Sequence, residues 1–269
     1  MKNSRMSNLH QQSISPWLFA LTLISIIFLP VPGIASGHDG QFSGDKQKEI
    51  EGIIREFILK NPKVILQSIQ DMEAREKHVK TQRIQQALAD RNADLINDPG
   101  SHVGGNPDGD VTLVEFFDYQ CGYCKRVHPT VRKLLKEDGN IRFVYKEFPI
   151  LGPASVYAAR AAIASRTQGK YLEFHNALME LKGPLSEERV LKTAKIVGLD
   201  AVKLAKDINL QETDADGVIR LNYRLAEELD INGTPAFIVG NKVIRGAVDL
   251  AALKKAVANG RKVKKAKGG

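Results

Sequence analysis

The stretch Val114–Val131, VEFFDYQCGYCKRVHPTV, contains the only two cysteines of the 269-residue chain. Cys121 and Cys124 follow the run Asp110–Tyr119, whose apolar and β-branched residues predict a buried strand. The residues after Cys124 have the spacing of an amphipathic helix. The sequence therefore predicts that the cysteine pair lies at a strand-to-helix turn, which constrains both the fold and the chemistry of the chain.

The position of the pair favours redox chemistry over two other roles. A disulfide across two residues constrains an unfolded chain very little, and a zinc site needs four ligands, of which only His128 follows at a suitable spacing. Amides at a helix start stabilise a thiolate, so Cys121 is expected to attack and Cys124 to resolve the mixed disulfide. Lys125, Arg126 and His128 are expected to add positive charge. Capture of Cu(I) by the two thiolates stays open; no cofactor is predicted.

The first residues predict export. Lys2 and Arg5 precede the apolar run Trp17–Leu29, which ends in small residues around Ala35. This is the pattern of a signal peptide over residues 1–35, cleaved near Ala35. The run has 13 residues, whereas a membrane-spanning helix needs about 20. The mature chain is therefore expected to be exported to an oxidising compartment.

Residues 36–100 are predicted to form a separate helical segment. Apolar residues recur at helical spacing from Ile50, and Asn61 and Pro62 are expected to cap and begin a second helix that runs to about Ile96. This thin stripe either packs on the main domain or pairs with the same stripe of another copy. Pairing is favoured, because a helix of roughly 35 residues would extend about 50 Å.

Residues 101–260 are predicted to form an α/β domain. Two strands flank the cysteine helix, helices occupy residues 153–230, and a hairpin turning at Gly240–Asn241 precedes a last helix. This order is typical of a mixed sheet covered by helices. The tail, residues 261–269, is basic; it is read as a solvated terminus, and no nucleic-acid partner is predicted.

Three segments, EFFDYQCGYC, GKYLEFHNALM and GTPAF, resemble the DsbA-like thiol:disulfide oxidoreductases of the bacterial cell envelope. The resemblance covers about residues 101–260 and implies a thioredoxin fold with a helical insertion. It implies that Cys121 is the nucleophile and Cys124 the resolving cysteine. It also implies a cis bond between Thr234 and Pro235, which would hold the substrate backbone, and a substrate contact at Tyr123.

The same resemblance implies that Glu115 is a partly buried carboxylate that relays protons to Cys124, with Lys146 as its pairing partner. Gly122, Tyr123 and Thr234 are similar to those of DsbC-type isomerases. The helical segment is similar to the N-terminal extension of ScsC-like and Com1-like proteins, which predicts a homodimer, with a trimer as the alternative.

The sequence therefore predicts a periplasmic thiol:disulfide interchange protein, with isomerase activity favoured and oxidase activity alongside it. The expected partners are unfolded or misoxidised exported proteins and a membrane redox protein of the Dsb type. A monomer-like disulfide oxidase is the first alternative, and a copper-binding envelope protein that uses the same thiolates is the second.

Overall fold

The computed structural model describes residues 44–209 and 214–267. The predicted signal peptide, residues 1–35 with cleavage near Ala35, lies outside the described residues. The chain divides into two compact units, Met1–Pro62 and Lys63–Gly269. The domain limits given above stay predictions. Within the described ranges, no helix is both long enough and apolar enough to cross a membrane.

The first unit contains α1 (Gly44–Lys60), an amphipathic helix without a buried residue. Its apolar residues include Ile53 and Phe57, whose side chains are 62% and 54% exposed. The Nδ2 atom of Asn61 donates to the carbonyl of Phe57 at 2.8 Å. The side chain of Asn61 therefore bonds back to the end of α1, although the sequence predicted it as the N-cap of the next helix. Pro62 is the first residue of that helix, as predicted.

Only the end of α2 (Pro62–Asp90) packs against the rest of the second unit. Leu88 is its one buried residue. Gln85 Nε2 donates to the carbonyl of Asn241 at 2.8 Å, and Lys80 Nζ lies 2.8 Å from a carboxylate oxygen of Asp230. The residues before Ile84 are exposed. The prediction of one helix to about Ile96 is wrong at its end.

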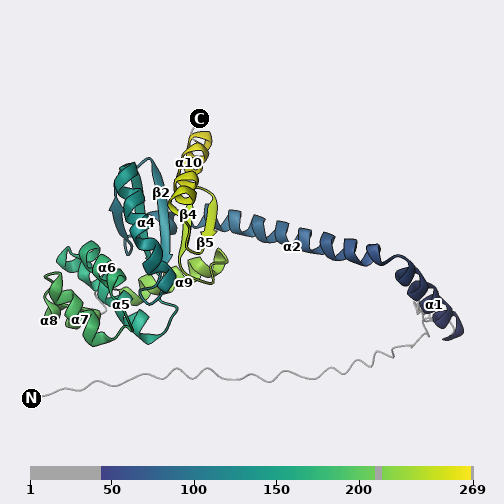
Figure 1. Cartoon of the computed structure of the whole chain (residues 1–269), viewed down its shortest axis with the longest axis horizontal. Helices are drawn as coiled ribbons and strands as arrows, with labels where there is room; N and C mark the ends of the chain where they lie inside the picture. The colour runs from purple at the N-terminus through teal and green to yellow at the C-terminus, as the bar shows by residue number, and fades with distance from the viewer. Residues whose placement is uncertain (1–43, 210–213, 268–269) are drawn as a thin grey trace, which may run out of the picture. The chain divides into compact units, whose positions relative to one another are not determined.

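The break lies at Arg91, after which α3 (Asn92–Ile96) begins. Figure 1 shows α2 as one continuous helix before this break. The break lets Leu95, which is 2% exposed, enter the core beside the sheet. The Arg91 guanidinium lies 3.1 Å from Asp94 and 3.4 Å from Glu228, so it ties the break to α9 (Ala215–Glu228). Burial of Leu95 therefore accompanies the loss of a straight helix.

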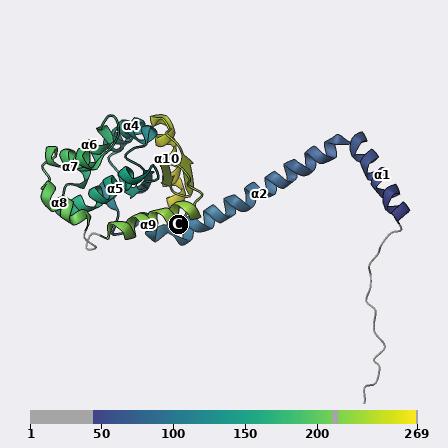
Figure 2. The ribbon, with the colours of Figure 1, turned by 90° about the horizontal axis from the view of Figure 1, so that it is seen from below.

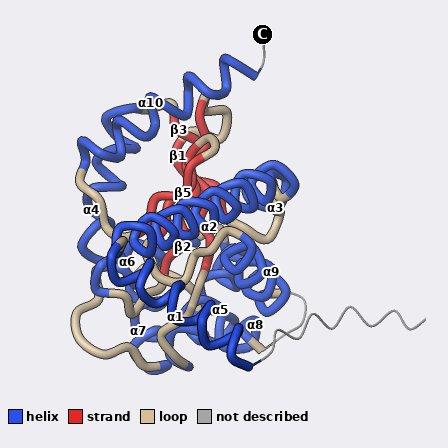
Figure 3. The backbone as a smooth tube through the Cα atoms, turned by 90° about the vertical axis from the view of Figure 1, so that its right-hand side faces the viewer, coloured by secondary structure: helices blue, strands red, loops and turns tan. Residues whose placement is uncertain are grey.

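One mixed sheet forms the centre of the second unit (Figure 3). Its strand order is β1-β3-β2-β4-β5. The strands are β1 (His102–Gly105), β2 (Val111–Phe117), β3 (Ile141–Glu147), β4 (Ala236–Val239) and β5 (Lys242–Arg245). β2 and β3 are parallel, and the other neighbours are antiparallel. The mixed sheet is therefore confirmed. The sequence does not predict β1, because two of its four residues are glycine.

Side chains that alternate along β2 divide the core into two parts. Leu113 and Phe117 face one side, with residues of α4 (Gly122–Asp138) and α10 (Leu250–Lys267). Val114 and Phe116 face the other side, with Leu95 and residues of α9. Figure 3 shows the sheet between these layers. The near-continuous apolar run of β2 is explained by burial on both faces.

Several helices lie between β3 and β4. They are α5 (Pro153–Ser165), a short 3-10 turn η1 (Arg166–Gln168), α6 (Tyr171–Glu180), α7 (Glu187–Ile196), α8 (Ala201–Ile208) and α9 (Ala215–Glu228). Figure 2 shows α5 to α8 lying together. The helices are interrupted near Gly169, Gly183 and Gly198, and all three glycines have positive φ angles.

Candidate active site

The two cysteines lie where β2 ends and α4 begins. Cys121 is the N-cap residue of α4, with an extended backbone, and its Sγ accepts a hydrogen bond from the backbone amide of Cys124 at 3.4 Å. Both cysteines are free thiols, and they are 6% and 0% exposed. The predicted strand-to-helix turn is therefore confirmed, with Cys121 at its outer edge.

The surroundings of the two thiols shift their pKa values in opposite directions. Hydrogen bonds from the Cys124 thiol, from Thr234 and from the amides of Cys124 and Tyr123 lower the pKa of Cys121 to about 5, although burial opposes the shift. Burial, the hydrogen bond to Cys121 and the charge of Glu115 raise the pKa of Cys124. At neutral pH, Cys121 is therefore the thiolate and Cys124 the thiol.

The loop before β4 lies beside Cys121. The peptide bond between Thr234 and Pro235 is cis, as the resemblance implies. Cys121 Sγ lies 3.3 Å from the carbonyl oxygen of Thr234, and the Thr234 hydroxyl helps to lower the pKa of the thiol. The antiparallel pairing of Phe116 with Ala236 brings this loop to the end of β2. The site therefore joins two motifs that lie far apart in the sequence.

Glu115 lies in the middle of β2, on the side of the sheet that faces α4. Its side chain is 4% exposed. Burial, followed by the charge of Cys121, raises the pKa of the carboxyl to about 8. The carboxyl also raises the pKa of Cys124. Glu115 is thus a buried group that titrates near neutral pH beside both cysteines.

Lys146 does not pair with Glu115, and this part of the expectation is wrong. Lys146 lies opposite Phe116 in the parallel ladder, so its side chain enters the other face of the sheet. There Nζ donates to the carbonyl of Asp94 at 2.7 Å and to the carboxylate of Asp98 at 2.9 Å. Lys146 is therefore an anchor for the segment after α3, and not a part of the cysteine site.

The predicted cluster of positive charge beside the pair is only partly present. Burial lowers the pKa of His128 to about 4, so its ring is neutral at neutral pH. Lys125 Nζ donates to the carbonyl oxygens of Leu178 and Leu181 at 3.2 and 2.5 Å. Arg126 is exposed and stacks over the ring of Tyr123, 4.9 Å from its centroid.

Sequence reasoning missed Asp118, which fixes the turn into Cys121. Its Oδ1 accepts bonds from the amide of Gln120 and the hydroxyl of Ser155, both at 2.7 Å, and its Oδ2 accepts one from the amide of Leu151 at 2.9 Å. Its backbone carbonyl accepts a bond from the amide of Cys121 at 3.0 Å. An acidic residue at the end of an apolar strand, three residues before a cysteine, is the sequence signal for this role.

A second buried carboxyl, Glu147, lies at the end of β3. It accepts hydrogen bonds from the hydroxyls of Tyr119 and Tyr171 at 2.9 and 2.7 Å. The Tyr119 oxygen also lies 3.1 Å from Nδ1 of His175. Burial raises the pKa of Glu147 to about 8. This network packs beneath the turn that carries Cys121 and was not predicted.

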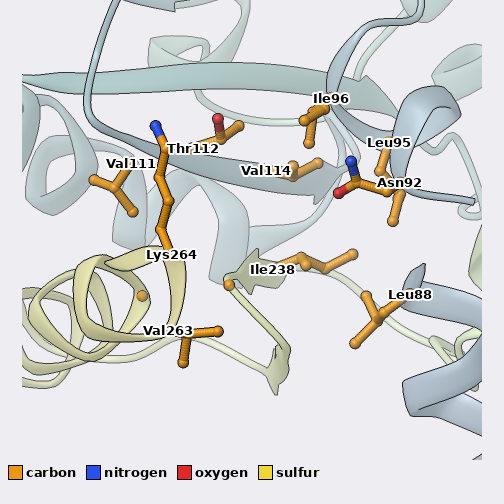
Figure 4. Close-up of a pocket in the computed structure, with 12 residues that line it drawn as sticks. Leu88, Asn92, Leu95, Ile96, Val111, Thr112, Val114, Ile238, Val263 and Lys264 are labelled. Atoms are coloured by element: carbon orange, nitrogen blue, oxygen red, sulfur yellow. The ribbon is translucent and has the colours of Figure 1, made fainter. Parts of the chain in front are cut away.

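Two of the cavities in the described part of the chain lie at different places relative to the cysteine pair. One, of about 280 Å³, lies against Val114 and Ile238, between α3 and α10, and no cysteine lines it (Figure 4). The other, of about 720 Å³, borders Gly122 and runs along α4. Across the described ranges, no group of three or more His, Cys, Asp or Glu residues is arranged to hold a metal ion.

This geometry agrees with the comparison with known families. A family model described as DSBA-like thioredoxin domain matches residues 112–258. The chain belongs to the DsbA-like thioredoxin domain family. The match contains both cysteines, the cis peptide bond and the inserted helices. The DsbA-like fold predicted from the sequence is confirmed.

Solved structures of DsbA-like and related proteins are similar to the chain. A thioredoxin-like oxidoreductase from Silicibacter pomeroyi is 47% identical, with a TM-score of 0.61 over 63% of this chain and 97% of that one. The thiol-disulfide exchange protein alpha-DsbA2 from Wolbachia pipientis is 31% identical, with a TM-score of 0.62 over 67% and 97%. Proteus mirabilis ScsC is 27% identical, with a TM-score of 0.61 over 82% and 99%.

Curated relatives of the DsbA-like domain include longer proteins. The Na(+)/H(+) antiporter NhaA 1 of Salinispora arenicola is 33% identical over 164 residues, which is 58% of this chain and 24% of the antiporter. The chain spans about a quarter of the length of the curated relatives it matches. The shared part is thus a fraction of those antiporters, and ion transport does not carry over to this chain.

Proposed function

We propose that this protein is an exported thiol:disulfide oxidoreductase that acts on the cysteines of other exported proteins. The observation that carries the proposal is the asymmetry of the pair. Cys121 caps α4 with a pKa of about 5, while burial raises the pKa of Cys124. A thiolate is the nucleophile in disulfide exchange, so this arrangement provides one attacking and one reserve sulfur.

The first step is attack of the Cys121 thiolate on a disulfide of the substrate. A bond forms between Cys121 Sγ and one substrate sulfur, and the other substrate sulfur leaves as a thiolate. If that thiolate, or another in the substrate, attacks the mixed disulfide, Cys121 is released and the substrate is isomerised without net redox change. If Cys124 attacks instead, the substrate is reduced by two electrons and Cys121 and Cys124 become a disulfide.

Attack by Cys124 requires loss of its proton, and Glu115 is the proposed acceptor. The carboxyl has a pKa of about 8 and lies in the same buried region. A base whose pKa lies near the working pH accepts and returns a proton with little cost. Glu115 therefore acts on Cys124 through proton transfer, in place of the paired arrangement with Lys146.

Thr234, Pro235 and Tyr123 are the proposed substrate contacts. Thr234 is half-buried and lies against Cys121 Sγ, so a polypeptide bound to that sulfur passes this loop. The side chain of Tyr123 is 59% exposed on the first turn of α4. Exposed backbone and an aromatic face suit substrates of varied sequence, as expected for unfolded or misoxidised chains.

Isomerase activity is favoured and oxidase activity accompanies it. An isomerase must hold its substrate while Cys121 exchanges disulfides. Gly122, Tyr123 and Thr234 resemble the residues at the same positions of DsbC-type isomerases. The low pKa of Cys121 also has a consequence for oxidation. Because it stabilises the reduced form, it makes a disulfide between Cys121 and Cys124 more oxidising. A membrane redox partner of the Dsb type would keep the pair in its working state.

Assembly into a homodimer, with a trimer as the alternative, is proposed for the N-terminal helices. Along α1 and α2, large apolar side chains are exposed at helical spacing. They include Ile53 (62%), Phe57 (54%), Leu66 (60%), Ile69 (43%), Met72 (47%) and Val79 (63%). Burial of one such side chain stabilises by about 1.5–3 kcal/mol. Pairing of these stripes between copies would place several active sites around one substrate.

The redox state of the pair in the cell tests the choice between activities. Free thiols are alkylated in intact cells with a reagent that adds mass, and the protein is separated by size. A mostly reduced pair supports the isomerase, and a mostly oxidised pair supports the oxidase. Fractionation of the same cells should place the protein in the periplasm, without residues 1–35.

A further inference from the structure

Tyr119 lies at the corner of the turn between β2 and α4. The amide of Cys121 donates to the carbonyl of Asp118 at 3.0 Å, so Tyr119 and Gln120 are the two central residues of a β-turn. The Tyr119 side chain is 1% exposed, which places it inside the protein, beneath the turn. Any shift of Tyr119 therefore moves the backbone from which Cys121 and α4 begin.

The hydroxyl of Tyr119 is held by partners from two other elements. Its oxygen lies 2.9 Å from Oε1 of Glu147, at the end of β3, and 3.1 Å from Nδ1 of His175, in α6. A hydroxyl donates one hydrogen bond and accepts others, so both contacts can be satisfied at once. The ring also packs edge-on against Phe117 and His175, with centroids 5.4 and 5.5 Å away. Tyr119 is therefore fixed at its tip as well as along its ring.

Glu147 is held in place by elements other than the cysteine turn. The parallel ladder pairs it with Phe117. Asn222 Nδ2, from α9, donates to its backbone carbonyl at 2.9 Å. Its side chain is 3% exposed, and its Oε1 also accepts a bond from the hydroxyl of Tyr171 at 2.7 Å. The carboxyl of Glu147 is thus a fixed point to which the Tyr119 hydroxyl is attached.

The two neighbours of Tyr119 attach the turn to a different part of the protein. The Asp118 carboxylate accepts bonds from the amide of Leu151 and the hydroxyl of Ser155. Gln120 Nε2 donates to the carbonyl of Leu151 at 3.0 Å and to the Ser155 hydroxyl at 2.9 Å. These bonds lead to the start of α5, whereas those of Tyr119 lead to β3 and α6. Loss of the Tyr119 bonds should therefore leave the turn formed but less firmly placed.

We propose that Glu147 is a positioning residue for disulfide exchange: through the Tyr119 hydroxyl it fixes the turn that places Cys121 Sγ for attack. This inference rests on the proposed function. Attack on a disulfide requires the reacting sulfurs to be aligned, and a small misplacement of the attacking group is costly. The effect of Glu147 is indirect, because Tyr119 lies between its carboxyl and the turn.

The experiment measures attack by Cys121 in the full-length Cys124→Ser protein, by stopped-flow exchange with the neutral reagent dithiodipyridine. The Cys121 thiolate forms a bond to one sulfur of the reagent, and the other sulfur leaves as a coloured thiopyridone. Because the pKa of Cys121 is about 5, the sulfur is ionised at neutral pH and the rate reports its placement. Tyr119→Phe should slow this attack about fivefold, the effect of one hydrogen bond.

Tyr171→Phe is the matched control, because it removes the other hydroxyl that is bonded to the same oxygen of Glu147. It should lower the urea midpoint of unfolding and leave the rate of attack unchanged. A folded Tyr119→Phe protein that attacks at the parent rate would overturn the inference. Equal slowing by the two changes would also overturn it, because the network would then act on stability alone.

A second pair of variants tests Glu147 itself. Glu147→Leu should slow attack about as much as Tyr119→Phe, and the two changes together should slow it no further, because the residues act as one unit. Glu147→Gln keeps an oxygen that accepts the bond, so it should recover most of the rate lost in Glu147→Leu. Additive effects, or equal rates in Glu147→Gln and Glu147→Leu, would contradict action through Tyr119.

If either Tyr119→Phe or Glu147→Leu fails to fold, the other variant decides with its own control. Failure of Cys121 to react with the reagent in the parent protein would contradict the proposed function itself. A reactive parent whose rate does not depend on Tyr119 or Glu147 would overturn the positioning role alone.

Discussion

Glu115 and Lys146 lie on neighbouring parallel strands, yet their side chains enter opposite faces of the sheet. The ladder pairs Glu115 with Tyr145 and Phe116 with Lys146. Lys146 is therefore one residue beyond the partner of Glu115, and because side chains alternate along a strand, the two charges lie on opposite faces of the sheet. Lys146 pairs with Asp98 at 2.9 Å. Glu115 remains buried without that cation, and its pKa rises to about 8.

The Glu115→Gln change should make the reduced protein more stable at pH 8 and slow the resolution of mixed disulfides. The folded carboxyl has a pKa of about 8 against an ordinary value of 4.5. The fold therefore retains a proton that the unfolded chain loses, and stability falls as the pH rises between these values. The gain should reach a few kcal/mol, since one pKa unit corresponds to about 1.4 kcal/mol.

Urea unfolding at pH 5 and pH 8 measures this effect, with the exposed Glu188→Gln as the control. The advantage of Glu115→Gln over the wild type should grow with pH, whereas the control should show no such trend. An advantage that is equal at both pH values would mean that the Glu115 carboxyl does not titrate in this window.

Replacement of Thr234 by valine should raise the pKa of Cys121 from its value of about 5. The hydroxyl helps to stabilise the thiolate, and loss of a hydrogen bond to a charged group costs about 1.5–3 kcal/mol. Valine keeps the shape of the side chain. Thiolate absorbance against pH measures the change, and the redox potential should become more reducing. An unchanged titration curve would remove Thr234 from the account of Cys121 reactivity.

Asp118 should control the geometry of the turn that leads into Cys121. Asp118→Ala removes an acceptor of three hydrogen bonds, whereas Ser155→Ala removes one of the donors. Attack by Cys121 and resolution by Cys124 should both slow in Asp118→Ala, by about tenfold or more, because misplacement of reacting groups is costly. Stopped-flow exchange with a model disulfide measures this. Ser155→Ala should show a smaller effect of the same kind.

A chain that begins at Lys80 should be a stable monomer. It lacks the exposed stripes of α1 and α2 but keeps Leu88 and Leu95, which pack beside the sheet. It should still exchange disulfides, but isomerise scrambled ribonuclease poorly. A chain that begins at residue 98 and also carries Asp98→Ala would instead lose both α3 and the Asp98 carboxylate. The buried Lys146 would then have no partner. Removal of one partner of a buried ion pair costs about 3–5 kcal/mol.

Light scattering and thermal unfolding separate these results. The wild-type chain should be an oligomer and the chain from Lys80 a monomer with a similar melting temperature. A monomeric wild type, or full isomerase activity in the shortened chain, would argue against the N-terminal helices as the assembly device.

The local parts of the site could be predicted from the sequence. Which side chains from distant segments face one another could not. The apolar run before Cys121, the helical spacing after it and the GTPAF segment placed the cysteines and the cis bond correctly. The partner of Glu115 depended on register between two strands, which no local pattern reports. The neutral state of His128 depended on its burial beside His175 of α6, which lies about 50 residues further along the chain.

The most direct test of the central claim is the capture of substrates on Cys121 in cells. Because Cys124 resolves the mixed disulfide, Cys124→Ser should accumulate proteins bound to Cys121 through bonds that a reductant cleaves. Cys121→Ser and the double variant should accumulate none. Diagonal electrophoresis of envelope extracts, followed by mass spectrometry, measures the adducts. Adducts on Cys124→Ser alone are the predicted result; their absence, or equal adducts on Cys121→Ser, would contradict the assignment of Cys121 as the attacking sulfur.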